Sequence, residues 1–370
     1  MTTNLAFVAP PVVMESGLGA DAPPWSDQLR DRMPLPPLSY AQRFEDFHLW
    51  RCFGDQERGF YVDVGAGHPV YDNVSFAFYL AGWRGITVEP NPALAALGRA
   101  VRPRDHLHEG LAGAAAGAAT LYLQREFHGL STTVAAHARQ AEKEVSRQSE
   151  ALTLPVTTLV ALCAQHAPAR FEFLKVDVEG AEADVLRGAD FSRFRPKMIV
   201  VEAIKPLSLE PAWDEWEPLL ARHGYGYVWD DELNRYYVAE EARALAAPLV
   251  AGPKWYADGP QIGNFKPAAT DPAHPDHRLA RLLADADLTL LPLMDRGQLF
   301  DLLTAGVAGL GRPAGAADIA AVMARLFGQS PAPQQIVPQD SETIAQAYRR
   351  IIDSDAFRAA CGRIAASYAW

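Results

Sequence analysis

The chain has 370 residues, 49% of them hydrophobic and 21% charged, which is ordinary for a globular protein with room for one large domain and a smaller one. The net charge is −11 without a basic run, and no apolar stretch reaches the roughly 18 residues of a membrane span, so we expect neither nucleic acid nor a bilayer as a partner. The three cysteines lie far apart and the first basic residue, Arg30, comes late for a signal peptide, which together predict a reduced, cytoplasmic location.

Residues 1–38 contain three Pro-Pro pairs and no sustained periodicity, and we expect an irregular N-terminal arm. Over residues 39–246, short β-rich runs alternate with helical ones, which predicts a doubly wound α/β domain. The expected strands are Phe60–Asp63, Ile86–Glu89, Leu107–Glu109, Phe173–Asp177, Met198–Glu202, Tyr225–Trp229 and Tyr236–Val238, with Ala119–Leu123 as an antiparallel strand near the edge. The expected helices include Ala93–Val101, Thr157–His166, Ala181–Gly188 and Ala212–His223, with Thr157 and Asp214 as starting residues.

Residues 247–271 hold several Gly and Pro and are predicted to be a linker. Beyond it, apolar residues recur at helical spacing, which predicts a small helical C-terminal domain over residues 272–370. These helices carry no chemical motif. We expect them to support a homo-oligomer or to position the substrate, with a simple structural cap as the alternative.

The first chemical signal is "GFYVDVGAG", a strand that runs into a glycine turn. A dinucleotide-binding turn reads G-x-G-x-x-G, but here Gly65 and Gly67 are followed by Val70 at the third position. Asp63 would also repel a pyrophosphate, so the turn favours a cofactor with positive charge and no phosphate, such as S-adenosylmethionine. Glu89, 26 residues after Asp63, is at a suitable distance to accept hydrogen bonds from ribose hydroxyls, although NAD enzymes place an acid there too. The alternative is that both acids only cap helices.

Three further acids are expected at the carboxyl edge of the sheet, where open α/β sheets bind ligands. Asp177 and Glu179 follow the fourth predicted strand and Glu202 ends the fifth. A hydroxyl substrate must lose a proton as a methyl group arrives, so one of these carboxylates, best Asp177, is the expected general base. A divalent cation on Asp177 and Glu202 is the alternative, but the sequence shows no metal-ligand cluster and we predict none. Glu182 is expected to be only the acidic first turn of a helix.

Taken together, several stretches resemble the FkbM family of S-adenosylmethionine-dependent methyltransferases. They are "SYAQRFEDFHLWR", "GFYVDVGAGHPVYDNVSFAFYLAGWRGITVEPNP", "GLSTT", "FLKVDVEGAEADVLRGADF" and "DELNRYYVAEE", and they span Ser39 to Glu241 in the order of the family. The resemblance implies a Rossmann-like class I methyltransferase sheet and methyl transfer to a hydroxyl, often on a sugar, glycan or natural product. It also implies that Asp63, Gly65 and Gly67 face the methionine part of the cofactor, that Glu89, with Asn91 beside it, faces the ribose, and that Leu111 lies near the adenine.

Some positions depart from the family pattern or extend it. Gly67 and His68 stand where the family has asparagine and aspartate, Glu109 replaces an asparagine, and Glu232 replaces a glycine. His68 is therefore a candidate base, with a role in the turn as the favoured alternative. The segment before the first strand could fold over the cofactor, and its candidate contacts are Tyr40, Gln42, Glu45 and Asp46, unless it only begins a surface helix. Residues 129–148 are expected to form a lid or a solvated loop. Asn234 and Arg235 are candidate substrate contacts. The core is expected to contain Trp213, Trp216 and Trp229.

The sequence therefore predicts an O-methyltransferase that uses S-adenosylmethionine and acts on a small molecule or glycan. Two other classes of protein remain open. An NAD-dependent sugar oxidoreductase would share the sheet and Glu89, but it should have the third glycine. A non-catalytic scaffold on the same fold would not need intact cofactor motifs, and these are intact.

Overall fold

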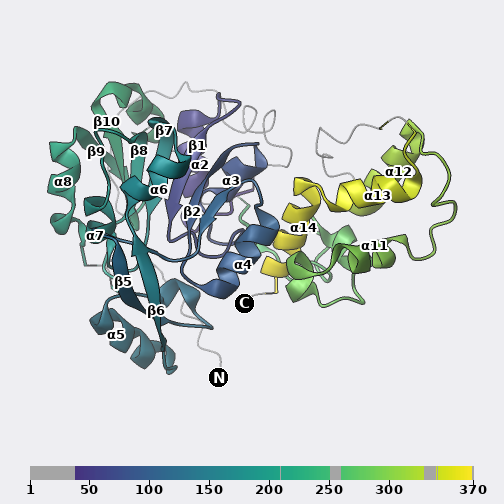
Figure 1. Cartoon of the computed structure of the whole chain (residues 1–370), viewed down its shortest axis with the longest axis horizontal. Coiled ribbons are helices and arrows are strands. Elements are labelled where there is room, and N and C mark those ends of the chain that lie inside the picture. The colour runs from purple at the N-terminus through teal and green to yellow at the C-terminus, as the bar shows by residue number, and fades with distance from the viewer. Residues whose placement is uncertain (1–37, 209, 251–259, 329–338, 340, 369–370) are drawn as a thin grey trace.

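A seven-stranded mixed sheet is the centre of this computed structural model, which describes residues 38–208, 210–250, 260–328, 339 and 341–368 (Figure 1). The spatial order of its strands is β3-β2-β1-β7-β8-β10-β9. Their bounds are β1 (Phe60–Val64), β2 (Arg84–Val88), β3 (His106–His108), β7 (Arg170–Val176), β8 (Arg195–Glu202), β9 (Tyr225–Asp230) and β10 (Asn234–Ala239). All pairs are parallel except those of β10, which runs antiparallel to β8 and β9. All seven strands predicted for this sheet are confirmed.

The order of the strands fixes where a ligand can bind. From β3 to β8 the sheet follows the order of a doubly wound α/β fold, and the direction of winding reverses between β1 and β7. Asp63 of β1 pairs with Lys175 of β7, and Val64 pairs with Val176, so the two strands end side by side. Ligands of such sheets bind outside the carboxyl ends at this reversal. The fold is thus a mixed α/β fold compatible with the methyltransferase sheet that the resemblance implies.

A separate three-stranded sheet, with the order β4-β6-β5, lies at the lower end of the view in Figure 1. Its strands are β4 (Leu111–Ala112), β5 (Gly117–Leu123) and β6 (Glu150–Thr157). The predicted strand Ala119–Leu123 is real and antiparallel, but it pairs with β6 instead of lying at the edge of the main sheet. The sequence prediction missed β6, because its side chains are mostly exposed or half-buried and it contains Pro155. Thr157 consequently ends a strand, and Thr158 is the residue that caps the following helix, through a bond from the Ala161 amide.

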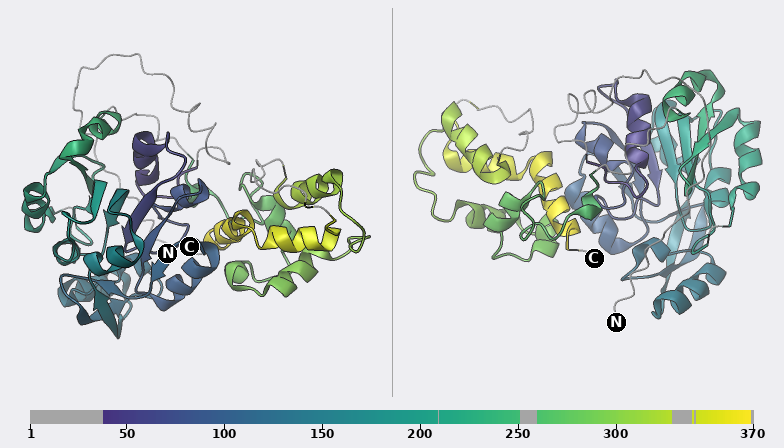
Figure 2. Two further views of the ribbon diagram at one scale, coloured as in Figure 1. Left: turned by 45° about the horizontal axis from the view of Figure 1, so that its top comes forward. Right: turned by 180° about the vertical axis from the view of Figure 1, so that it is seen from behind.

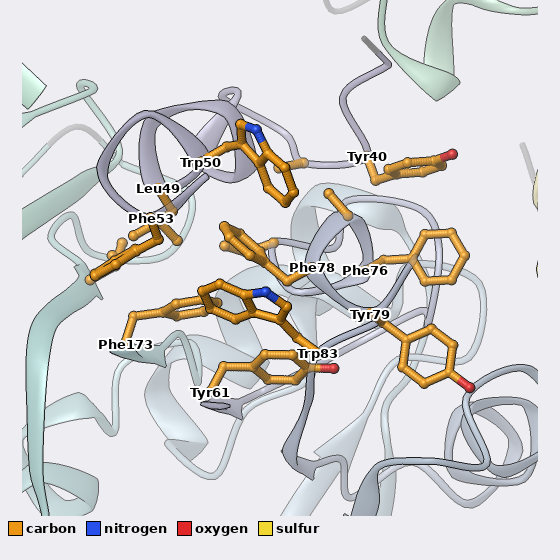
Figure 3. Close-up of a cluster of buried hydrophobic side chains, with 14 of the residues drawn as sticks. Tyr40, Leu49, Trp50, Phe53, Tyr61, Phe76, Phe78, Tyr79, Trp83 and Phe173 are labelled. Carbon is orange, nitrogen blue, oxygen red and sulfur yellow. The ribbon is translucent and has the colours of Figure 1, made fainter. Parts of the chain in front are cut away.

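Helices cover both faces of the main sheet because successive residues of a strand point to opposite sides. Tyr61 and Phe173 face one core, and Val62 and Leu174 face the other. The first core is packed by α2 (Glu45–Phe53), α3 (Phe76–Leu80), α4 (Pro92–Val101) and α9 (Ala246–Val250). The second is packed by α6 (Leu159–His166), α7 (Glu182–Arg187) and α8 (Glu217–Arg222). Figure 3 shows the aromatic part of the first core, where rings from α2, α3 and the strands interlock.

The predicted helix Ala212–His223 is wrong in its first half. A 3-10 helix, Trp213–Glu215, comes first, and α8 begins only after Trp216. Trp216 is 1% exposed and has a non-helical backbone, since its ring is drawn into the second core. Pro218 is accepted in the first turn of α8, where its missing N–H costs no hydrogen bond. Asp214 therefore starts no helix. The helices predicted at Ala93–Val101 and Ala181–Gly188 are confirmed as α4 and α7.

The C-terminal residues form a helical part with its own apolar core, seen beside the sheet in both views of Figure 2. Its helices are α10 (His277–Leu282), α11 (Arg296–Thr304), α12 (Ala316–Phe327), α13 (Ile344–Ile352) and α14 (Asp355–Ala366), with a 3-10 helix at Leu288–Leu293. Helix α14 packs against α3 and α4 as well. At Gly362 a Cβ atom would lie 2.9 Å from Val70 Cγ2 and 3.1 Å from Val101 Cγ1, so a larger residue there would require these side chains to shift.

The proposed division into domains remains a prediction. The N-terminal arm lies outside the described residues except for Leu38. Within the predicted linker, Leu249 of α9 is buried in the first core and Gln261 forms a bridge with Ser39. The remaining helical elements are α5 (Ala135–Val145), Glu240–Leu245, and the short turns His128–Leu130 and Ile262–Asn264. The three cysteines are buried as free thiols, and none of the described helices has the length and apolar character needed to cross a membrane.

Candidate active site

The glycine turn after β1 lies at the reversal point of the sheet. Gly65 has φ +74°, and a Cβ atom there would lie 1.7 Å from the carbonyl oxygen of Asp177, so the turns after β1 and β7 touch and only glycine fits. Gly67 has φ +61°, and a Cβ atom there would meet no atom of the described residues within 4 Å. The turn is therefore closed on the side of β7 and open at Gly67, as a binding turn must be.

Glu89 joins this turn to the end of β2. Its Oε2 accepts a hydrogen bond of 2.7 Å from the Gly67 amide, and its Oε1 accepts one of 2.7 Å from the Asn91 amide. Burial raises the pKa of Glu89 to about 7, although the two amides pull in the other direction. Asn91 caps α4, because its Oδ1 accepts from the Ala93 amide at 3.0 Å. The helix-cap alternative therefore describes Asn91, whereas Glu89 binds the glycine turn.

Asp63 caps no helix either, and its carboxylate belongs to a buried polar network. Its Oδ2 accepts a hydrogen bond of 2.5 Å from Ser75 Oγ, which in turn accepts one of 2.8 Å from Arg102 Nη2. Among the described residues Oδ1 has no hydrogen-bond partner, and the nearby Lys175 Nζ lies 3.6 Å away. Asp63 is thus a buried carboxylate with one acceptor position unfilled.

Lys175 is a site residue that the sequence analysis did not identify. It is 5% exposed, its Nζ donates to the Gly65 carbonyl at 2.8 Å, and it lies 3.3 Å from Asp177 Oδ2. Burial opposes its charge, but the carboxylates of Asp177 and Asp63 outweigh that effect and raise its pKa. A lysine inside the otherwise apolar strand "FLKV" was the available signal, because buried lysines are rare unless paired.

Three acids predicted at the carboxyl edge do come together. One carboxylate oxygen from each of Asp177, Glu179 and Glu202 lies within 4.8 Å of the others. The Asp177 side chain is 30% exposed, whereas Glu202 is 7% exposed and its Oε2 has no hydrogen-bond partner in the part of the chain that the structure describes. Burial, followed by the charge of Asp177, raises the pKa of both Glu179 and Glu202 well above the usual range.

Glu179 stands in a turn that several elements hold in place. Its φ is +56°, a left-handed conformation that is rare outside glycine. Its carbonyl oxygen accepts a hydrogen bond of 2.8 Å from Thr132 Oγ1, so the segment predicted as a lid or loop contacts this turn and carries α5. Glu182 begins α7 as expected, and its Oε1 also accepts bonds from the amides of Val178 and Gly180.

Asp72 is a second residue that the sequence analysis missed. It is exposed and has φ +48°. Its pKa is raised to about 6 by partial burial of the carboxyl group and by the nearby charge of Asp177. It therefore adds a carboxylate on the solvent side of the Asp177 cluster. No composition or spacing signal marked it, because its position depends on the path of the turn after Gly67.

His68 serves the turn, which was the favoured alternative to a catalytic base. Its Nδ1 accepts hydrogen bonds from the amides of Val70 at 3.2 Å and Tyr71 at 3.0 Å. Burial lowers the pKa of His68 to about 3, so the ring is neutral and its Nε2 carries the proton. A ring that already uses its acceptor nitrogen for the backbone is poorly suited to take a proton from a substrate.

The predicted cofactor contacts before β1 and after β3 are placed as follows. Tyr40 is 1% exposed and packs edge-on against Phe76 at 4.8 Å, within the cluster of Figure 3. Burial raises its pKa to about 12, opposed by the charge of Arg363. Gln42 is exposed, and its carbonyl oxygen accepts from Gln261. Leu111 is 8% exposed and packs within the small sheet. Their contacts with a cofactor remain predictions.

The start of α2 reaches the carboxyl edge through Glu45. Its Oε1 accepts a hydrogen bond of 2.9 Å from Asn234 Nδ2, and Asn234 pairs with Glu202 across β10 and β8. Burial raises the pKa of Glu45 to about 8, with Asp231 as the next cause. Asp46 has a different role, since it accepts from Ser39 Oγ and from the Tyr40 amide and so shapes the turn before α2.

Arg235 pairs with Val201 near the carboxyl end of β8, and its contact with a substrate remains a prediction. Its guanidinium stacks 4.2 Å from the ring of Trp213 and 3.9 Å from that of Tyr227, and it pairs with Glu217 at 3.1 Å. Alternation along β10 sends Asn234 and Arg235 to opposite faces, which the quoted motif could not show. Trp216 is in the core as predicted. Trp213 stacks on Arg235, and Trp229 packs against His48 at 4.5 Å.

Comparison with known proteins points to a methyltransferase domain. Residues 63–227 match the family model of the methyltransferase FkbM domain. The match begins at Asp63 and covers the glycine turn, Glu89 and the Asp177 turn, but it leaves out α2, β10 and the C-terminal helices. No curated protein and no solved structure matches the chain. The chain therefore carries a methyltransferase FkbM domain.

Proposed function

We propose that the chain transfers a methyl group from S-adenosylmethionine to a hydroxyl group of a sugar, glycan or natural-product substrate. The observation that carries this proposal is the open turn at Gly67, whose amide is bound by the buried carboxylate of Glu89. Asp63, Gly67 and Glu89 lie at the carboxyl ends of neighbouring parallel strands, at the side of the sheet where such folds bind cofactors.

The residues at this turn fit a positively charged cofactor. Asp63 offers an unfilled acceptor at Oδ1 to an ammonium group, and the remaining lone pairs of Glu89 can accept from ribose hydroxyls. S-adenosylmethionine, when bound, supplies a methyl group already activated by a sulfonium. Asn91 and Leu111 would complete the site on the side of β2 and β4.

The protein's own part is to orient the substrate, exclude water and receive a proton. Asp177 is the proposed base, because its carboxylate is partly exposed and its Oδ2 lies 3.3 Å from Lys175 Nζ. Glu179 and Glu202 complete the wall beside it. A hydroxyl placed against Asp177 would pass its proton to that carboxylate as the methyl group is transferred.

Binding of NAD is the principal competing function, and two features argue against it. Val70, at the place of the third glycine, is fully buried in the first core, so the chain there packs inward. The first helix described after β1, α3, begins only at Phe76, so no helix N-terminus stands directly behind the Gly65–Gly67 turn to receive a pyrophosphate.

Calorimetric titration of the full chain with S-adenosylhomocysteine and with NAD tests the proposal. We expect binding of the first ligand only. Asp63→Asn and Glu89→Ala should each weaken it roughly 10- to 150-fold, because each removes hydrogen bonds to a charged group that contribute about 1.5–3 kcal/mol. Glu57→Ala is the matched control, since Glu57 is exposed and precedes the opposite end of β1. Equal affinity in all four folded proteins, or preferential binding of NAD, would refute the proposed function.

A further inference from the structure

We propose that Asp177, Glu179 and Glu202 bind a hard divalent cation, of the Mg²⁺, Mn²⁺ or Ca²⁺ class, at the carboxyl edge of the sheet. Each residue contributes an oxygen, and the three oxygens lie within 4.8 Å of one another. Ligand oxygens on opposite sides of such a cation are about 4–5 Å apart, given bonds of about 2.0–2.6 Å. The three oxygens therefore fit one coordination shell, and a set of carboxylates alone selects a hard cation.

Glu202 provides the second, independent observation. It is 7% exposed, and none of the residues that the structure describes donates a hydrogen bond to its buried Oε2. A buried carboxylate oxygen is normally paired, hydrogen-bonded or bound to a metal, because desolvation otherwise costs several kcal/mol. Lys175 does not fill this position, since its Nζ bonds the Gly65 carbonyl and lies beside Asp177.

The backbone fixes each proposed ligand before any cation binds. The Asp177 amide donates to the Val64 carbonyl at 3.0 Å, and Glu202 lies within β8 with Asn234 as its partner on β10. The Glu179 turn is held by Thr132 and by Glu182. The three carboxyl groups have the ammonium group of Lys175 beside them, and a divalent cation would neutralise more of their negative charge than this single positive charge can. The competing occupant is a proton shared between the carboxyl groups of Asp177 and Glu202.

A cation at this site would also act on the substrate, a consequence that rests on the proposed methyl transfer. Asp177 and Glu179 are partly exposed, so the coordination positions left open face the solvent side of the sheet edge. A hydroxyl group bound there is more acidic than a free one. Vicinal hydroxyls of a sugar suit two such positions, and Asp177 would then bind the cation through one carboxylate oxygen while the other receives the hydroxyl proton.

The test uses the full chain after treatment with a chelator, without cofactor or substrate. Titration with Mn²⁺, followed through the electron paramagnetic resonance signal of free Mn²⁺, should show one site that Mg²⁺ or Ca²⁺ competes for. Glu202→Gln should weaken binding at least tenfold. Changes to residues that only support the ligands already cost about 10- to 100-fold in metal affinity, and this variant removes the charge of a ligand itself. Glu215→Gln, an exposed acid outside the cluster, should leave the affinity unchanged.

Thermal unfolding provides a second measurement that separates metal binding from misfolding. In chelator, Glu202→Gln should be at least as stable as the parent, because it no longer buries a third acid beside Asp177 and Glu179. Mn²⁺ should raise the melting temperature of the parent more than that of the variant. Absence of Mn²⁺ binding, as a shared proton would give, or equal affinity in Glu202→Gln, would overturn the inference. Binding of S-adenosylhomocysteine is measured separately, so failure of the metal site leaves the proposed function intact and the reverse also holds.

Discussion

Cofactor binding should release a proton from Glu89. This carboxyl group is buried between the Gly67 and Asn91 amides, and burial raises its pKa to about 7. If ribose hydroxyls donate to it, binding requires the ionised form, so the pKa in the complex falls below that of the free protein. Below about pH 7 the Glu89 carboxyl group of the free protein carries a proton, because its pKa is raised to about 7. This proton must leave when the ligand binds. The affinity should therefore rise with pH, not fall.

The size of the effect follows from the ionised fraction. With a pKa of about 7, roughly a tenth of Glu89 is ionised at pH 6 and about nine tenths at pH 8. The apparent affinity for S-adenosylhomocysteine should thus increase about tenfold between these values and level off above pH 8, which corresponds to about 1.4 kcal/mol. Between pH 5 and pH 6 the slope should approach tenfold for each pH unit.

Calorimetry at pH 6, 7 and 8, in buffers with different ionisation enthalpies, measures both the affinity and the proton released. Glu89→Gln keeps the shape of the side chain without the titration, so its weaker binding should not depend on pH over this range. Two other carboxyl groups titrate near the same edge, those of Glu45, with a pKa of about 8, and Asp72, with a pKa of about 6. Any pH dependence that remains in Glu89→Gln measures their contribution. A flat profile in the parent, or the same slope in Glu89→Gln, would show that the ribose does not bind Glu89.

Two further predictions concern the framework. Gly65→Ala should lower the thermal stability far more than Gly67→Ala. A left-handed backbone costs alanine about 1–2 kcal/mol at either position, but only at residue 65 would the Cβ atom lie 1.7 Å from the Asp177 carbonyl oxygen. Equal losses would contradict the close approach of the two turns. Asp276→Ala should destabilise the chain by about 3–5 kcal/mol in denaturant unfolding. Asp276 and Arg363 form two hydrogen bonds of 2.7 Å, and both side chains are about 5% exposed, so the variant would bury the arginine without its carboxylate. Asp285→Ala, at an exposed position, is the control, and a cost below about 1 kcal/mol for Asp276→Ala would show that water reaches Arg363.

The main sheet could be predicted from the sequence because its strands are short apolar runs between clear turn signals. The Gly65–Gly67 turn was also predictable, since glycine spacing is local information. Strand β6 was not, because its exposed residues and Pro155 give no strong alternation. The break before α8 was missed for a different reason: burial of Trp216 is a tertiary effect that overrides a helical pattern.

The site was predictable in position but not in its contacts. Asp63 and Glu202 lie at the carboxyl ends of β1 and β8, and Glu89 and Asp177 directly follow β2 and β7. The parallel order alone therefore placed these four acids on one edge. The distances depend on which side chains turn inward, and this cannot be read from the order of the residues. Lys175 entered the site because it pairs with Asp63 across two strands that are more than one hundred residues apart.

The same lysine explains why the two proposals stand on separate observations. Its Nζ lies between Asp63, at 3.6 Å, and Asp177, at 3.3 Å, so it divides the carboxyl edge into a cofactor side and a substrate side. On the cofactor side, Asp63 keeps an unfilled oxygen beside the open turn, which fits a cationic group of S-adenosylmethionine. On the substrate side, Glu202 keeps an unfilled oxygen beside two further carboxylates, which fits a divalent cation. Lys175 cannot pair fully with both sides, and Arg102 reaches Asp63 only through Ser75 Oγ, so each side keeps a carboxylate oxygen that has no hydrogen-bond partner among the described residues.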